Sequence, residues 1–287
     1  MNRAVGCLIA LMAGLVGGCG GSDRAEADRP RHVLLISIDT LRPDHLGCYG
    51  YDRPTSPFLD ELANQGVVFE QAYATSPWTL PPPATMLTGL YPSHHGAYAV
   101  RHMLPDEVPT LQQMLGAAGF QSAGVVNSIY LATHALDRGF GYFKYLKEDY
   151  AQRQPSDVTD EAIAWFDTQF DAQKPYFVFL HYYDVHSDYA SLPDYERMFV
   201  RPYAGDITGN SRQLWEYRRG HRELSEADLD HLRDLYDASI RQLDDELKRL
   251  FATLDERGLL SDTLVIITSD HGEGFMAHGG VRSGPTR

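Results

Sequence analysis

Acidic and imidazole side chains follow three apolar runs of the sequence. The first run ends at Asp39, the middle run ends at His181 with His186 shortly after it, and the last run ends at Asp270, which His271 follows. A single carboxylate in such a place often only caps a helix. Two carboxylates, one of them followed by a histidine, predict a metal site. Hard divalent cations prefer carboxylate oxygens, and an imidazole ligand moves the preference towards zinc or manganese.

A lone hydroxyl stands in front of consecutive prolines in the segment SPWTLPPPATMLTGLYPSHHG, residues 76–96. Thr79 precedes Pro81–Pro83, and the residues after the prolines are typical of a short helix. Two interpretations follow: Thr79 caps this helix, or a rigid helix entry holds Thr79 as a nucleophile. They are compatible, because a helix N-terminus also stabilises an anionic group.

Strand-like and helix-like segments alternate along the chain and must position these side chains. Alternation of this kind predicts an α/β fold, a doubly wound and mostly parallel sheet in an α/β/α sandwich. Ligands collect at the carboxyl ends of the strands in such a sheet. The predicted strands are residues 32–39, 67–72, 120–126, 176–181 and 263–270. The predicted helices are residues 57–66, 84–89, 109–116, 159–170 and 225–257. Residues 187–223 are predicted to be a long loop or lid.

Length and charge limit the classes of function. The chain has 287 residues, of which 43% are hydrophobic and 22% charged, enough for one large α/β core. Its formal net charge of −14 argues against a nucleic-acid-binding surface. An anionic substrate therefore needs local positive charge, from a metal or from a few basic side chains.

The N-terminus has the pattern of a bacterial lipoprotein signal. Arg3 precedes an apolar run, residues 8–16, which is too short to span a bilayer, and the sequence Val16-Gly17-Gly18-Cys19 follows. Residues 1–19 are therefore predicted to be the signal, with Cys19 lipidated; the alternative is an ordinary signal peptide that is cleaved nearby. Residues 20–31 are predicted to be a flexible tether. This predicts a lipid-anchored protein of the bacterial cell envelope, periplasmic or at the outer membrane.

Three ordered motifs identify a family resemblance. The segments ISIDTLRPDHLGCYGY, TLPPPATMLTGLYPSHHG and TSDHGEGF resemble the sulfatase branch of the alkaline phosphatase-like superfamily, and the resemblance covers residues 32–287. It implies an alkaline phosphatase-like α/β/α sandwich, and hydrolysis or transfer of sulfate and phosphate esters at one or two bound metals.

The resemblance implies a ligand set for the metal. Asp39 matches the first metal-binding Asp, and Thr40 stands where many sulfatases have a second one. Asp270 and His271 match the later metal pair, with His where many calcium-type sulfatases have Asn. This exchange favours a softer metal than calcium, so the implied divalent cation is Mn, Zn or Ca, with calcium the least favoured.

The resemblance also places Thr79 at the nucleophile of the C/S-x-P-x-R motif of sulfatases. Pro81 is retained, but Pro83 occupies the arginine position. Sulfatases convert Cys or Ser there to formylglycine, which Thr cannot form by that route. Phosphoethanolamine transferases, lipoteichoic acid synthases and nucleotide phosphodiesterases use threonine, whose alkoxide attacks phosphorus. Thr79 therefore favours phosphoryl chemistry.

Further residues receive roles from the same resemblance. His186 matches the histidine that contacts the ester, and His181 would assist it or bind a second metal. Asn127 stands where sulfatases often carry Lys and could donate to a phosphoryl oxygen. His278 is placed near the site. The alternatives are structural histidines at His181 and His186 and a surface histidine at His278.

The C-terminal part of the family pattern is missing from this sequence. Relatives continue past the DHGE motif, whereas here Ser283 stands where a basic group is often found. The expectation is an incomplete C-terminus of the domain over residues 32–287.

The function predicted from these features is a sulfatase-family, metal-dependent hydrolase of sulfate or phosphate esters. Its substrate would be a small-molecule, glycan or lipid ester. The alternatives are a phosphoryl or phosphoethanolamine-type transferase acting on envelope glycans or lipids, and an inactive sulfatase-like pseudoenzyme.

Overall fold

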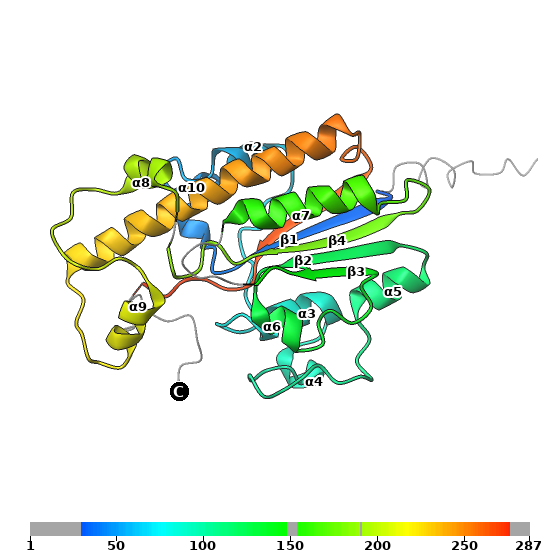
Figure 1. The fold of residues 1–287 in the computed structure, drawn as a ribbon, viewed down its shortest axis with the longest axis horizontal. Helices are drawn as coiled ribbons and strands as arrows, with labels where there is room; N and C mark the ends of the chain where they lie inside the picture. The colour runs from blue at the N-terminus through cyan, green and yellow to red at the C-terminus, as the bar shows by residue number, and fades with distance from the viewer. Residues whose placement is uncertain (1–29, 148–153, 190, 276–287) are drawn as a thin grey trace, which may run out of the picture. The chain divides into compact units, whose positions relative to one another are not determined.

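The computed structural model describes residues 30–147, 154–189 and 191–275 (Figure 1). The predicted signal with Cys19, and the candidate site residue His278, lie outside these ranges. A single folded unit begins at Arg31. None of the helices in the described part of the chain is long and apolar enough to cross a bilayer.

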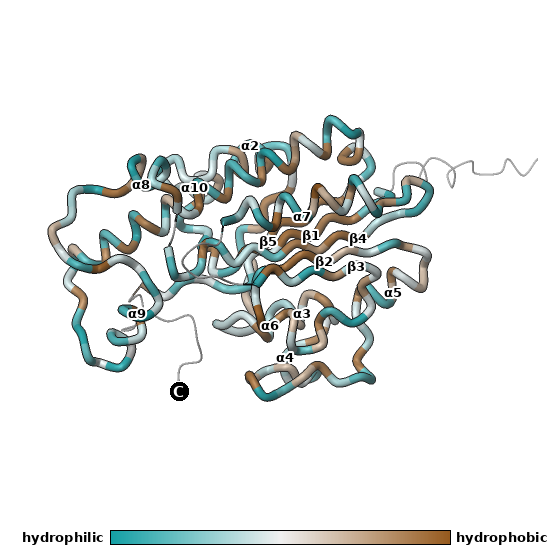
Figure 2. Tube along the Cα trace, in the orientation of Figure 1, coloured by the Kyte–Doolittle hydropathy of each residue, from teal (hydrophilic) through white to brown (hydrophobic). Residues whose placement is uncertain are grey.

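A sheet of five parallel strands forms the centre of this unit, in the order β3-β2-β4-β1-β5. Every strand therefore ends at the same edge. The central strands are apolar along their length, as Figure 2 shows, because helices cover both of their faces. The strand bounds are β1 His32–Ile38, β2 Gln121–Val126, β3 Tyr142–Tyr145, β4 Tyr176–Tyr182 and β5 Thr263–Ser269.

Helices cover both faces of the sheet, which confirms the doubly wound α/β/α fold (Figure 1). On one face lie α2 Pro57–Gln65, α7 Pro155–Thr168 and α10 Glu226–Glu256. On the other lie α3 Pro81–Thr88, α4 Pro92–His95, α5 Leu111–Ala117 and α6 Ile129–Thr133. Alternate residues of a strand face opposite layers, so that Leu34 and Ile36 pack with α7 and α10 while Leu35 packs with α3.

The long helix α10 also fixes the start of α2. Ser56 occupies the predicted N-cap position of α2, but its side chain makes no capping hydrogen bond. Instead, the buried carboxylate of Asp244 accepts the backbone N–H groups of Phe58 (2.8 Å) and Leu59 (2.9 Å). A side chain remote in sequence thus satisfies two of the donors that a helix start leaves unpaired.

Two predictions of secondary structure are wrong. Residues 67–72 form no strand, and the side chains of Val67 and Phe69 are 82% and 69% exposed. The apolar composition of residues 67–72 suggested a strand, but no strand in the described part of the chain pairs with this segment. The region 187–223 is not one long loop, since it contains α8 Pro193–Phe199 and α9 Ser211–Arg218. The short 3₁₀ turns Pro43–His45 and Gly47–Tyr49 were not predicted either.

Candidate metal and nucleophile site

Asp39, Asp270 and His271 meet at the carboxyl edge of the sheet. Strands β1 and β5 are adjacent and parallel, with Ile38 opposite Ser269, so that Asp39 and Asp270 follow the paired ends directly. All three side chains are buried, and one possible ligand atom from each lies within 4.8 Å of the others. The predicted metal residues are therefore brought together by strand register.

The hydrogen bonds of the two carboxylates leave one oxygen of each without a partner. Oδ1 of Asp270 accepts the backbone N–H groups of Thr40 (3.2 Å) and His271 (2.7 Å). Oδ2 of Asp39 accepts the hydroxyl of Thr79 at 3.0 Å. Among the described residues, Oδ2 of Asp270 and Oδ1 of Asp39 have no hydrogen-bond partner. Buried carboxylate oxygens without partners are costly, and a bound cation would compensate both.

The imidazole of His271 faces these two oxygens. Its Nε2 lies 3.5 Å from Oδ2 of Asp270 and 3.6 Å from Oδ1 of Asp39, while Nδ1 lies 3.2 Å from the carbonyl of Gly272. Ligands at 2.0–2.1 Å from a tetrahedral zinc ion are about 3.4 Å from each other. The two carboxylates and His271 thus have the donor chemistry and the spacing to hold zinc or a similar divalent ion.

The charges of the three groups are strongly linked. Burial and the neighbouring Asp39 charge raise the pKa of Asp270 to about 7. Burial also acts to raise the pKa of Asp39, but contact with His181 and the charges of His271 and His186 outweigh it and lower this pKa to about 2. Burial acts to lower the pKa of His271, but the two carboxylates outweigh burial and raise it. Without a metal, the site therefore retains protons that a divalent cation would displace.

Thr79 lies against this cluster at the entry to α3. Its Oγ1 is 3.4 Å from Nε2 of His271, besides its hydrogen bond to Asp39. Helix α3 begins at Pro81, three residues before the predicted start, and it has no side-chain cap. Because Pro81–Pro83 carry no N–H group, the first turn offers no donors to a cap or to an anion. The geometry therefore gives Thr79 no capping role, and its hydroxyl faces the carboxylate and imidazole instead.

Comparison with known proteins agrees with this geometry. The sequence model of the Sulfatase family matches residues 31–286, nearly the whole chain. The chain belongs to the sulfatase family. This places it in the alkaline phosphatase-like group that the three motifs indicated.

Individual relatives of this sulfatase-family chain carry different names. It is 25% identical to an ulvan-active sulfatase of Formosa agariphila, with 86% of this chain and 51% of that protein covered. It is 26% identical to the multifunctional alkaline phosphatase superfamily protein PehA of Trinickia caryophylli, with coverage of 86% and 64%. A phosphonate monoester hydrolase of Agrobacterium radiobacter shares the fold, with a TM-score of 0.72, 21% identity and coverage of 90% and 66%. The chain thus spans between half and two thirds of the length of these two sequence relatives.

His181 lies behind the metal cluster of the sulfatase-family chain. Its side chain is fully buried on β4, with Nε2 3.4 Å from Oδ2 of Asp39 and Nδ1 3.1 Å from the hydroxyl of Ser37. Ser37 and His181 are paired residues of the adjacent strands β1 and β4. His181 is thus placed to orient Asp39 through Oδ2, whereas His271 lies nearer Oδ1. His181 does not belong to the cluster of possible metal ligands.

Asn127 and His186 lie on neighbouring loops at the same edge. The Asn127 amide accepts the backbone N–H of Tyr183 at 2.7 Å and donates to Asp184 at 2.9 Å. Asn127 therefore holds the loop that carries His186. The His186 ring stacks on Tyr183 at 4.4 Å between centroids, and its Nδ1 donates to the Ser187 carbonyl at 2.7 Å. His186 is close enough for its charge to act on Asp39.

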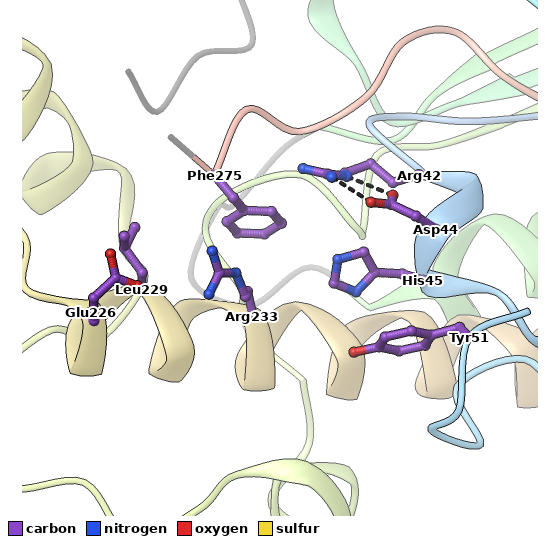
Figure 3. Close-up of a pocket in the computed structure, with 8 residues that line it drawn as sticks. All are labelled: Arg42, Asp44, His45, Tyr51, Glu226, Leu229, Arg233 and Phe275. Carbon is purple, nitrogen blue, oxygen red and sulfur yellow. Dashed lines mark hydrogen bonds and ion pairs between the residues drawn. The ribbon is translucent and has the colours of Figure 1, made fainter. Parts of the chain in front are cut away.

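A cavity of about 460 Å³ lies between the loops that follow β1 and β5 and helix α10 (Figure 3). Arg42 and Phe275 line it from the loops that follow β1 and β5, and Arg233 lines it from α10. None of the clustered metal residues lines this cavity, and neither does Thr79. Two residues of this region, Arg42 and Tyr236 of α10, were not predicted to have a role. Arg42 stood inside a quoted motif, whereas Tyr236 had only the apolar pattern of a buried helix face.

Proposed function

We propose that this chain is a metal-dependent ester hydrolase in which Thr79 is the nucleophile and phosphoryl esters are the preferred substrates. One observation carries the proposal: the Thr79 hydroxyl lies 3.0 Å from Asp39 and 3.4 Å from His271, in the same cluster as the metal-binding atoms. A nucleophile needs this proximity to the groups that activate it.

The metal would be held by Asp39, Asp270 and His271. Two carboxylates and one imidazole suit zinc or manganese better than calcium. When bound, such an ion lowers the pKa of an adjacent hydroxyl and withdraws charge from the ester.

The residues of the chain then arrange the displacement. The Thr79 hydroxyl donates its hydrogen bond to Oδ2 of Asp39, which directs the proton away from the attacking oxygen. As Oγ1 forms a bond to phosphorus, its proton passes to Oδ2 of Asp39, and the bond from phosphorus to the leaving alcohol oxygen breaks while that oxygen takes a proton from His186. Water then attacks the phosphorus of the phosphothreonine, the bond from phosphorus to Oγ1 breaks, the phosphate product leaves and Oγ1 regains a proton. Asn127 keeps the loop that carries His186 in place, so that the imidazole is available to the leaving oxygen.

Residue types at three positions support phosphoryl rather than sulfate chemistry. Thr79 stands where a formylglycine precursor is Cys or Ser, and Pro83 stands at the arginine position. The Asn127 amide is bonded to the neighbouring loop, where sulfatases often have a charged Lys. The name of the phosphonate monoester hydrolase says that a protein with this fold acts on a phosphorus ester, and PehA is named a multifunctional protein of the alkaline phosphatase superfamily.

A panel of esters tests the proposal. The purified protein, loaded with Zn²⁺ or Mn²⁺, is assayed with aryl phosphate monoesters and diesters, an aryl phosphonate and an aryl sulfate. We expect phosphorus esters to be favoured, and Thr79→Ala to abolish turnover. The matched control is Thr85→Ala, which removes a hydroxyl from the same helix that contacts Thr75 and His95 instead of the metal residues. Sulfate turnover that survives Thr79→Ala would contradict the proposal, and no turnover of any ester by metal-loaded protein would favour an inactive relative.

We also propose that the protein is lipid-anchored in the bacterial cell envelope and acts on a glycan or lipid ester there. The signal pattern ending at Cys19 supports the anchor, and the name of the ulvan-active sulfatase provides a precedent for a glycan ester. Metabolic labelling with a fatty-acid analogue tests the anchor: the wild-type protein should be labelled and Cys19→Ala should not.

A further inference from the structure

Thr40, in the loop that follows β1, has a strained backbone. Thr40 follows Asp39 directly and has a φ of 55°, in the left-handed region that β-branched residues rarely adopt. This conformation directs the Thr40 N–H to Oδ1 of Asp270 at 3.2 Å. The Thr40 hydroxyl is buried and has no hydrogen-bond partner among the described residues. Interactions of its own side chain therefore do not hold the turn.

The hydroxyl of Tyr236 makes the hydrogen bonds that hold this turn. Tyr236 is fully buried on α10, and its hydroxyl donates to the Thr40 carbonyl at 2.7 Å. The same oxygen accepts the backbone N–H of Arg42 at 2.9 Å. One hydroxyl thus bonds to both ends of the three-residue turn Thr40–Arg42.

This turn also contacts the loop that carries Asp270 and His271. The Arg42 guanidinium donates to the carbonyl of Glu273 at 2.9 Å and lies 5.7 Å from the ring centroid of Phe275, near which Figure 3 shows it. The Phe275 ring in turn packs edge-on against Tyr236, with 5.0 Å between centroids. Tyr236 therefore contacts both loops that carry the metal residues.

We infer that Tyr236 is a positioning residue for the metal site. Its hydroxyl keeps the Thr40 turn left-handed, so that the Thr40 N–H fixes Oδ1 of Asp270 and leaves Oδ2 directed at the metal. This inference rests on the proposed metal site. According to this inference, the metal site depends on α10, although α10 contributes none of the proposed metal ligands.

Zinc affinity of hydroxyl-deletion variants tests the inference. Zn²⁺ binding to the wild-type chain, Tyr236→Phe and Tyr176→Phe is measured by competition with a fluorescent chelator. Tyr176 is the matched control, because it is also fully buried and its hydroxyl contacts Leu259 and Thr263 at the other end of the sheet. We expect Tyr236→Phe to weaken zinc binding about tenfold or more, because both hydrogen bonds of its hydroxyl to the turn are lost. Tyr176→Phe should change zinc binding less than about twofold.

A rescue separates positioning from general destabilisation. Glycine adopts the left-handed conformation without strain, so Thr40→Gly should make the Tyr236 hydroxyl less necessary. We expect Tyr236→Phe to cost less than about threefold in zinc affinity when Thr40→Gly is also present. This double variant also keeps the test decisive if Tyr236→Phe alone folds poorly.

The outcomes distinguish the two proposals. If the wild-type chain binds zinc and Tyr236→Phe binds it equally well, the positioning role is overturned while the metal site stands. An equal loss of affinity in Tyr176→Phe, or no rescue by Thr40→Gly, would also overturn it. If the wild-type chain does not bind zinc, the metal site falls and the positioning role falls with it.

Discussion

The hydroxyl of Thr79 lies 3.0 Å from the carboxylate of Asp39, although the first precedes a helix and the second ends a strand. This contact joins the proline segment to the metal cluster. Oδ2 of Asp39 accepts the hydroxyl, and Oδ1 remains directed at His271. In the proposed site, the two oxygens of one side chain would thus serve the nucleophile and the metal separately.

A change at Thr79 should separate chemistry from metal binding. Thr79→Val keeps the shape but removes the attacking oxygen, so we expect turnover of a phosphodiester to fall about 10³-fold or more. Zinc affinity should fall less than about tenfold, because both carboxylates and His271 remain. Thr79→Ser should retain measurable turnover. Intact-mass analysis after acid quenching should detect a phosphorylated Thr79 in the wild-type protein; equal turnover by Thr79→Val would contradict the assignment.

Metal binding should depend on pH, with a sign set by Asp270. Its pKa is raised to about 7 in the metal-free site, by burial and by Asp39. Below this pH the carboxyl group of Asp270 holds a proton that zinc must displace. Above this pH the group is ionised and zinc displaces no proton from it. Because the pKa of His271 is raised as well, its imidazole also holds a proton at low pH. Zinc affinity should therefore fall at least about tenfold per pH unit below pH 7 and depend less on pH above it. Calorimetry in buffers of different ionisation enthalpy should detect release of at least one proton per zinc at pH 6; no release would show that Asp270 is already ionised.

Replacement of His181 should lower the zinc affinity of the site, because His181 orients Asp39. His181→Asn takes away the imidazole beside Asp39 and its link to Ser37. Groups that orient a metal ligand typically contribute 10- to 100-fold in affinity, so we expect about a tenfold loss of zinc binding. The control is His134→Asn, a buried histidine that contacts the carbonyls of Tyr130 and Val100. An equal loss in both variants would indicate general destabilisation instead.

Asp244 should contribute to stability rather than to chemistry. Asp244→Ala leaves the N–H groups of Phe58 and Leu59 without their acceptor. Each unsatisfied donor costs about 1–3 kcal/mol, so the loss of the acceptor for two donors should lower the free energy of unfolding by about 2–6 kcal/mol. Asp245→Ala removes a half-exposed carboxylate next to it and should cost less than about 1 kcal/mol. Urea unfolding measures both, and similar losses would show that Asp244 does not fix the start of α2.

The sheet, and the meeting of Asp39 with Asp270 at its edge, could be predicted because local sequence determines both. A strand with helices on both faces must be apolar throughout, and β1 and β5 each end where their first carboxylate appears. Strand register then places Asp39 beside Asp270. The helix after the proline run was also predicted, but α3 begins at Pro81, inside the run, because proline suits the first turn of a helix.

Other features depend on partners that are remote in sequence. Residues 67–72 have the composition of a strand, but a strand also needs a neighbouring edge, and none pairs with them among the described residues. The hydrogen bonds of the Asn127 amide to Tyr183 and Asp184 were not predicted, because these residues lie 56 and 57 positions away. The predicted contact of Asn127 with substrate stays a prediction. Tyr236 could not be identified because its hydroxyl acts on a turn 196 residues away.

The prolines of α3 have a consequence for the entropy of folding. Their φ angles are restricted in the unfolded chain as well, so ordering Pro81–Pro83 costs less than ordering three other residues. A catalytic group normally gains its alignment at the expense of chain freedom. Here three residues of the segment that leads from Thr79 into the helix have lost much of that freedom before the protein folds, so ordering them consumes less of the folding free energy.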